Sequence, residues 1–259
     1  MLDDIVMAKQ EEIEFAKGRL PLDELKSRTA NHLAERSFRK ALTASGNLAL
    51  IAELKRKSPS KGMLRERFDP VSLAQEMERA GASALSVLTD ERFFGGSLDS
   101  LRDVKHFTGI PVLRKDFIVD PYQVYEAAWY QADAILLIVR ILEEERLTAC
   151  LQVADRLGLD ALVEVHSEGE LDVALSAGAG LIGINHRDLT TFTLDPKLSD
   201  RLVPRIPAGK TIVVESGIQS SADIKRIRKL GAHAVLIGET LMIAPSPAAK
   251  IGELFAGTW

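Results

Sequence analysis

The chain has 259 residues, a formal net charge of −4, and a composition that is 46% hydrophobic and 27% charged. This balance is typical of a globular protein and excludes intrinsic disorder, collagen and coiled coil as descriptions of the whole chain. The length suits one α/β barrel, because such barrels commonly fill about 250 residues as one domain. DNA binding needs a clustered positive surface, which this charge does not indicate, so we expect no nucleic-acid partner.

The apolar stretches and the N-terminus predict a cytoplasmic protein. The longest strongly apolar stretch is 134–139, whereas a membrane helix needs about 20 such residues, so we expect no membrane association. The N-terminus carries Asp3 and Asp4 and lacks the basic and apolar regions of a signal peptide. The single cysteine, Cys150, cannot form an internal disulfide.

Short apolar runs rich in β-branched residues recur along the chain and predict strands. They are continuous and not alternating, as expected for strands that are buried on both faces of a parallel sheet. The runs occupy residues 48–54, 84–88, 111–113, 134–139, 161–165, 181–184, 211–214 and 234–237.

Helical patterns separate these runs. Asp120 and Pro121 have the residue types that favour a helix start. Further helices are predicted over 70–80, 143–157, 168–177 and 221–230. Strands that alternate with helices in this way predict an α/β protein, a (β/α)₈ TIM barrel.

We expect residues 1–259 to form a single barrel domain in which residues 1–45 are an N-terminal helical extension. Residues 4–17 are amphipathic, and residues 22–32 are compatible with a second helix. A barrel does not need these helices, so we expect them to cap its bottom or flank one side.

Titratable residues follow the predicted strands, and barrel enzymes carry their catalytic residues at those carboxyl ends. Glu53 and Lys55 are two residues apart and share one side of the first strand. Lys115 and Glu164 end the third and fifth strands. One such pair is readily explained as a structural ion pair. Four charges that converge in a barrel mouth favour a catalytic role, because unpaired burial is costly.

Glycines after the last two strands predict an anion site. Ser216 and Gly217 follow the seventh strand, and Gly238 follows the eighth. Each glycine alone could serve a tight turn, but barrel enzymes frequently bind phosphate at these two loops.

Five segments, in chain order, resemble indole-3-glycerol-phosphate synthase. They are IAELK at 51–55 with SPSKG at 58–62, LRKDFI at 113–118, GINHRDL at 183–189 and ESGI at 215–218. The resemblance implies a (β/α)₈ barrel of tryptophan biosynthesis. It further implies conversion of 1-(2-carboxyphenylamino)-1-deoxyribulose 5-phosphate to indole 3-glycerol phosphate, with release of carbon dioxide and water and without a cofactor or metal.

The resemblance implies roles for the four charged residues. Lys115 resembles the general acid that protonates the ribulose carbonyl oxygen. This role leads us to expect a pKa lowered toward neutrality by burial and by the nearby Lys55. Glu164 resembles the carboxylate that acts as a base and stabilises charge. Glu53 and Lys55 resemble a second acid–base pair.

The resemblance also implies three groups of substrate-binding residues. The phosphate group would be held by Ser216, Gly217, Gly238 and Glu239, chiefly through backbone N–H groups. The anthranilate end and its carboxylate would be held by Ser58, Asn185 and Arg187. The aromatic ring would lie against Phe94, Phe117 and Leu136.

Two residues near these motifs are expected to point away from the ligand. The Glu239 carboxylate would repel a phosphate, so we expect it to turn outward and leave only its amide at the ligand. His186 lies between Asn185 and Arg187, and we expect it to point away as well.

Two other functions remain open from the sequence. One is a sugar-phosphate isomerase or epimerase, metal-assisted through His166 and His186, with Glu164 and Glu215 as carboxylate donors. The other is a phosphate-ligand binder without catalytic activity. For the enzyme we expect a phosphorylated small-molecule substrate and a monomer, with a weak homo-oligomer as the alternative.

Overall fold

Eight parallel strands close into a barrel in the computed structural model, which describes residues 2–258. The strands are β1 (Ala49–Leu54), β4 (Ala84–Leu88), β5 (Val112–Lys115), β6 (Ala134–Ile138), β7 (Asp160–Val165), β8 (Leu181–Asn185), β9 (Thr211–Glu215) and β10 (Ala234–Ile237). They follow the chain order around the ring, and β1 closes it by pairing with both β4 and β10. The predicted TIM barrel is therefore confirmed, and every predicted strand is present with ends shifted by at most two residues.

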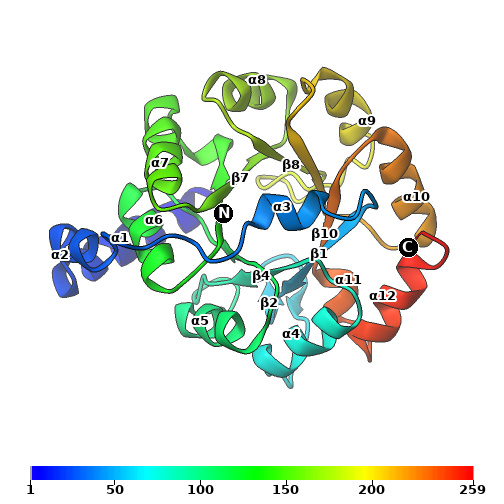
Figure 1. The fold of residues 1–259 in the computed structure, drawn as a ribbon, viewed down its shortest axis with the longest axis horizontal. Coiled ribbons are helices and arrows are strands. Elements are labelled where there is room, and N and C mark those ends of the chain that lie inside the picture. The colour runs from blue at the N-terminus through cyan, green and yellow to red at the C-terminus, as the bar shows by residue number, and fades with distance from the viewer. Residues whose placement is uncertain (1, 259) are drawn as a thin grey trace.

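Helices surround the barrel, as Figure 1 shows. Those that follow barrel strands are α4 (Pro70–Arg79), α5 (Leu98–Phe107), α6 (Pro121–Trp129), α7 (Glu144–Arg156), α8 (Glu168–Ser176), α9 (Leu198–Leu202), α10 (Ser221–Leu230), α11 (Glu239–Met242) and α12 (Pro247–Phe255). Short 3₁₀ turns are η1 (Val139–Ile141) and η2 (Val203–Arg205). The expected start of α6 is confirmed, because the Asp120 side chain accepts a hydrogen bond from the Tyr122 backbone N–H.

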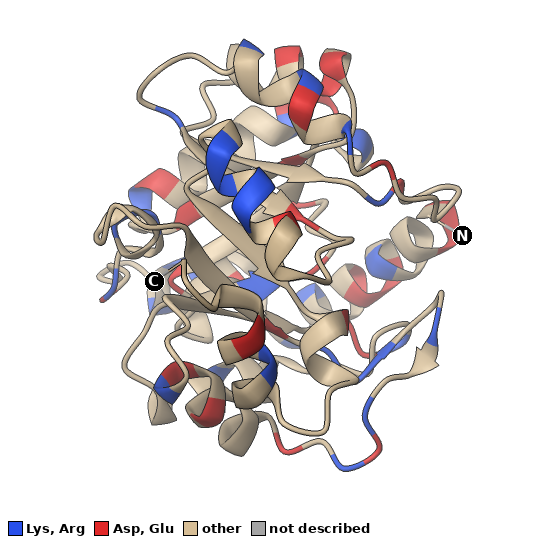
Figure 2. Cartoon of the chain, turned by 90° about the vertical axis from the view of Figure 1, so that its right-hand side faces the viewer, with Lys and Arg blue, Asp and Glu red and all other residues tan. Residues whose placement is uncertain are grey.

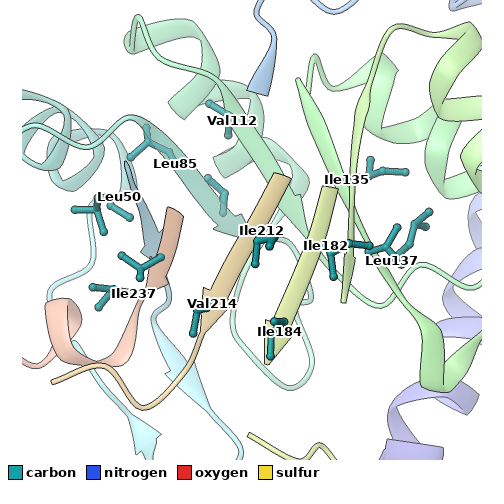
Figure 3. Packing of buried hydrophobic residues seen from close by; sticks show 14 of the residues in the cluster. Leu50, Leu85, Val112, Ile135, Leu137, Ile182, Ile184, Ile212, Val214 and Ile237 are labelled. Carbon is teal, nitrogen blue, oxygen red and sulfur yellow. The ribbon is translucent and has the colours of Figure 1, made fainter. Parts of the chain in front are cut away.

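Alternate residues of each strand face opposite sides of the barrel wall. One set, with Ile182, Ile184 and Val214, points outward and packs under the helices (Figure 3). The other set, with Ile51 and Leu162, fills the barrel interior. This alternation decides which residues at the strand ends face the interior.

The N-terminal extension covers two parts of the barrel. Helix α3 (Phe38–Thr43) lies over the centre of the ring in Figure 1, and Phe38 and Leu42 pack on the first inward residues of the strands. Helices α1 (Leu2–Arg19) and α2 (Leu22–Arg28) lie at one side, near α6. The extension therefore both caps the bottom and flanks one side.

Helix α1 is also tied to the carboxyl end of the barrel. The ammonium group of Lys9 lies 3.1 Å from a carboxylate oxygen of Asp90 and 3.1 Å from one of Asp116. Asp90 accepts hydrogen bonds from the backbone N–H groups of Phe93 and Phe94. Lys9 therefore joins the extension to two loops at the open end of the barrel.

The loop after β1 contains a small hairpin of β2 (Lys57–Ser58) and β3 (Gly62–Met63), which the sequence did not predict. Basic and acidic residues are interspersed over the outer helices in Figure 2. Between residues 2 and 258, no helix combines the length and the apolar character needed to span a bilayer.

Candidate active site

One pocket opens at the carboxyl ends of the barrel strands. All fourteen residues that the sequence assigned to catalysis or binding line it, although they come from all eight barrel strands or the loops that follow them. Its wall also contains residues to which the sequence analysis gave no binding role, among them Glu215, Phe192, Leu194 and Gln219.

The floor of this pocket is a layer of four titratable side chains, Glu53, Lys115, Glu164 and Glu215. They come from β1, β5, β7 and β9, the first, third, fifth and seventh strands of the barrel. Alternate strands of a TIM barrel contribute the four side chains of each interior layer. We call this set the charged layer. The next interior layer below it consists of apolar residues two positions earlier on the same strands, Ile51, Leu113, Leu162 and Val213.

The ammonium group of Lys115 lies among the carboxylates of the layer. Its Nζ is 3.0 Å from Glu164 Oε2 and 3.5 Å from Glu215 Oε2. Burial alone would lower the pKa of Lys115, but the charges of Glu164, Glu215 and Glu53 outweigh burial and raise it. The expected lowering is therefore wrong, because the sequence did not reveal how many carboxylates would surround this lysine.

The two nearest carboxyl groups have opposite pKa shifts. Burial would raise the pKa of Glu164, but Lys115 and His166 outweigh burial and lower it. The pKa of Glu215 is raised to about 8, chiefly by burial. The charges of Glu164 and Glu53 raise it further, whereas the charge of Lys115 lowers it. Near neutral pH, Glu164 is therefore ionised and Glu215 carries a proton in the ligand-free pocket.

Glu215 is the residue of the layer that sequence reasoning missed as a member of the site. It had been considered only as a metal ligand in an alternative function. Its position two residues after Val213, which faces the interior, gives the signal that could have revealed it.

Two glycines leave the space that the carboxyl groups occupy. A Cβ atom on Gly183 would lie 2.4 Å from Glu215 Oε1, and one on Gly238 would lie 2.2 Å from Glu53 Oε1. Both distances are shorter than real Cβ contacts, so a side chain at either position would displace a carboxyl group. Gly238, which the sequence assigned to phosphate binding, therefore also makes room for the charged layer.

Glu53 and Lys55 form the pair that their spacing predicted. Lys55 Nζ lies 2.8 Å from Glu53 Oε1, and both side chains line the pocket. Lys55 therefore supplies a second positive charge beside the charged layer. Although it is paired with Glu53, its side chain still lines the pocket and can contact a ligand.

The turn after β9 has a strained backbone. Ser216 has a φ of 66° and Gly217 has a φ of 73°, in the left-handed region that a residue with a side chain rarely adopts. The ring of His186 lies outside this turn, with Nδ1 3.2 Å from the Ser216 carbonyl oxygen and Nε2 3.0 Å from Ser199 Oγ. His186 is not part of the pocket lining, and it supports the turn from outside the barrel.

The expected outward orientation of Glu239 is wrong. Glu239 Oε2 lies 3.4 Å from an Nη atom of Arg187, and both side chains line the pocket. The guanidinium group of Arg187 attracts the carboxylate across the mouth, which a sequence cannot reveal for residues 52 positions apart. A substrate carboxylate that binds Arg187 would compete with Glu239 for it.

The apolar wall contains the three expected residues. Phe94 and Phe117 are tilted against each other with ring centroids 5.9 Å apart, and Leu136 lies on β6. Such aromatic pairs contribute about 0.5–1.5 kcal/mol beyond burial and can hold a flat ring. Asn185, at the end of β8, orients the neighbouring segment by accepting a hydrogen bond from the Arg187 backbone N–H.

The two histidines considered for a metal do not share a site. His166 lies between Glu164 and Glu170, whereas His186 contacts Ser199 and the Ser216 backbone. In the part of the chain from 2 to 258, no three His, Cys, Asp or Glu side chains are arranged to hold a metal ion.

Residues 2–254 match the family model described as indole-3-glycerol phosphate synthase. The chain belongs to the indole-3-glycerol phosphate synthase family. A curated indole-3-glycerol phosphate synthase of Dehalococcoides mccartyi (strain CBDB1) is 47% identical over 258 residues, which cover 98% of this chain and 99% of that protein. One from Carboxydothermus hydrogenoformans is 44% identical over 262 residues, covering 98% and 99%.

Solved structures with lower sequence identity share the fold. A 3-hexulose-6-phosphate synthase superimposes with a TM-score of 0.65 at 17% identity, covering 81% of this chain and 99% of that one. A thiamine phosphate pyrophosphorylase from Pyrococcus furiosus gives a TM-score of 0.60 at 17% identity, covering 84% and 96%. The predicted indole-3-glycerol phosphate synthase function, a decarboxylating lyase of tryptophan biosynthesis that acts on a phosphorylated small molecule, is confirmed by the family match and the curated relatives.

Proposed function

We propose that the charged layer closes the indole ring of 1-(2-carboxyphenylamino)-1-deoxyribulose 5-phosphate. The anthranilate ring carbon that bears the carboxylate attacks the ribulose carbonyl carbon, and the carbonyl oxygen takes a proton from Lys115. The raised pKa of Lys115 makes it a weak acid in the ligand-free pocket, so its positive charge beside the developing alkoxide is the larger part of its contribution. The proton that Glu215 holds 3.5 Å away can then restore the ammonium group.

Glu164 and the Glu53–Lys55 pair carry the later steps in this proposal. Carbon dioxide leaves, and the electrons of its bond return to the benzene ring while Glu164 stabilises the positive charge on nitrogen. Lys55 then gives a proton to the departing hydroxyl, which leaves as water. Glu53 accepts the proton whose loss completes the aromatic five-membered ring. Their separation of 2.8 Å supports this exchange.

The proposed binding mode spreads the substrate across the pocket. The phosphate lies at the backbone N–H groups of Ser216, Gly217, Gly238 and Glu239 with Lys55 nearby. The anthranilate carboxylate lies at Arg187, helped by Asn185 and Ser58. The ring lies against Phe94, Phe117 and Leu136. Arg187 suits this role because a guanidinium group can bind a carboxylate through two parallel hydrogen bonds.

One observation carries these assignments: four acid–base groups form a single interior layer directly below the binding residues.

We further propose that residues 1–259 act as one domain, without a cofactor, in the cytoplasm. The protein is a monomer in this proposal, with a weak homo-oligomer as the alternative.

Separating carbon dioxide release from indole formation tests the division of roles. We expect Lys115→Met to suppress both, because ring closure precedes both. We expect Lys55→Met to release carbon dioxide in a single turnover while indole absorbance lags at least about tenfold. Lys17→Met on α1, a partly exposed lysine outside the pocket, is the matched control. Equal loss of both signals in Lys55→Met would contradict its assignment to dehydration.

A further inference from the structure

His166 contacts Glu164 of the charged layer but does not line the pocket, and the steps proposed above do not use it. Its Nε2 is 3.2 Å from Glu164 Oε1, and its Nδ1 is 3.1 Å from Glu170 Oε2. The His166 side chain is only 1% exposed, as is that of Glu164. A buried imidazole between two carboxylates is stabilised in its protonated form, because Nδ1 then donates a hydrogen bond to Glu170 and the positive ring attracts the Glu164 carboxylate.

The contacts continue from His166 to the protein surface. Arg140 Nε lies 2.9 Å from Glu170 Oε1, and an Nη atom of Arg140 lies 2.5 Å from Asp188 Oδ2. Asp188 also accepts hydrogen bonds from the Thr190 and Thr191 backbone N–H groups. Asp188 precedes these residues in the loop after β8, where it directly follows Arg187.

The charges alternate in sign along this line. Negative Glu164, positive His166, negative Glu170, positive Arg140 and negative Asp188 follow one another, and exposure rises from 1% at Glu164 to 33% at Asp188. We call these five residues the His166 chain. Its inner end is the carboxylate nearest to Lys115, and its outer end orders the loop of the substrate-binding arginine.

We propose that protonated His166 is a positioning residue that holds Glu164 ionised and aimed at Lys115, and that the His166 chain couples this carboxylate to the Arg187 loop. The inference rests on the proposed role of Glu164. His166 lines no part of the pocket, so it acts through Glu164 and not on the substrate.

The charged groups around His166 favour its protonated form together. Burial would lower the pKa of His166, but Glu164 and Glu170 outweigh burial and raise it to about 9. The nearby cations Arg140 and Lys115 are themselves paired with carboxylates, Arg140 with Glu170 and Lys115 with Glu164. His166 is therefore a cation across the neutral range, and the positive charge lowers the pKa of Glu164.

A double-mutant cycle with Glu164→Gln, His166→Gln and both changes together tests the inference. We expect His166→Gln to lower kcat about tenfold or more with little change in KM, and to move the acidic limb of the kcat profile to higher pH. In the Glu164→Gln background the same change should have almost no effect, because the residue through which His166 acts is gone. His233→Gln, a histidine at the other end of the barrel, is the matched control.

The outcomes separate the inference from the assignment on which it rests. Equal losses from His166→Gln in both backgrounds, or an unshifted acidic limb, would overturn the role of His166 alone. A Glu164→Gln variant with the wild-type rate would overturn the assignment of Glu164 and the inference together. If His166→Gln fails to fold, Glu170→Gln replaces it, and there the alkaline limb should move to lower pH because His166 loses one carboxylate.

Discussion

Lys9 and Lys115 are both buried lysines among carboxylates, and in both the surrounding charges outweigh burial and raise the pKa. They differ in what surrounds the carboxylates. Asp116, one partner of Lys9, is also paired with Arg114 and accepts a hydrogen bond from the Phe117 backbone N–H. Of the charged side chains in the Lys9 cluster, only Asp116 reaches the pocket lining. The carboxylates of the Lys9 cluster are thus held by two buried cations and by backbone N–H groups, and the cluster is closed to a ligand except at Asp116.

The Lys115 cluster has more carboxyl groups than positive charges. Lys115 and Lys55 face Glu53, Glu164 and Glu215, and the excess is relieved when Glu215 keeps its proton to a pKa of about 8. All five side chains line the pocket. The comparison teaches that an ion cluster behind the pocket, with its carboxylates held by cations and backbone N–H groups, fixes loops in place. A cluster whose side chains all face a ligand can instead store a proton.

The largest expected effect comes from removing the lysine of the open cluster. Lys115→Met should lower kcat about 10³-fold, since acid–base groups contribute about 10²–10⁴-fold. The free energy of unfolding should fall less than for a change at Lys9, because the remaining carboxyl groups face the pocket and can take up protons. Steady-state kinetics and urea unfolding measure the two quantities. A variant that unfolds easily yet keeps its activity would invert the comparison.

Removing the lysine of the closed cluster should affect stability first. Lys9→Met leaves Asp90 buried without its counter-charge, and we expect the free energy of unfolding to fall by about 3 kcal/mol. Urea unfolding measures the loss, and kcat should change far less than in Lys115→Met. Lys17→Met on the same helix is the control, with a change below about 1 kcal/mol because its ion pairs are partly exposed. Equal losses in the two variants would show that burial of Lys9 is irrelevant.

The smallest effect, measured per pH unit, is expected in the pH dependence of stability. Glu215 has a pKa of about 8 in the folded protein, against about 4.3 when unfolded. Between these values only the unfolded state releases the proton, so the contribution of Glu215 to stability falls as pH rises toward 8. Glu215→Gln should therefore gain on the wild type by up to about 1.4 kcal/mol per pH unit from pH 5 to 8. Parallel stability curves would mean that Glu215 is ionised in the folded state.

The barrel was predictable from local patterns. Strands buried on both faces need continuous apolar runs, so even the short run at 111–113 marked β5 (Val112–Lys115) within two residues. The common place of the fourteen residues in one pocket was predictable for a related reason, because the carboxyl end of each run marks the functional face of a barrel. Their roles, which the resemblance implies, stay predictions. The helix over 4–17 was also visible, and α1 (Leu2–Arg19) extends it at both ends.

The features that the sequence could not reveal depend on distances between residues that are far apart in the chain. The sign of the pKa shift of Lys115 depends on three carboxyl groups from three other strands. The direction of Glu239 depends on Arg187, and the role of Lys9 depends on Asp90. Each needs the closed ring of strands before its partner can be identified.

The missing side chains of Gly183 and Gly238 have a consequence for the history of such a protein. Each glycine gives up the volume that one carboxyl group fills, Gly183 for Glu215 and Gly238 for Glu53. A side chain at either glycine would displace the neighbouring glutamate and is therefore expected to be harmful. If the glutamate is lost, the position no longer needs to be glycine. The two members of each pair are therefore expected to be inherited together and to be replaced together when a lineage abandons this chemistry.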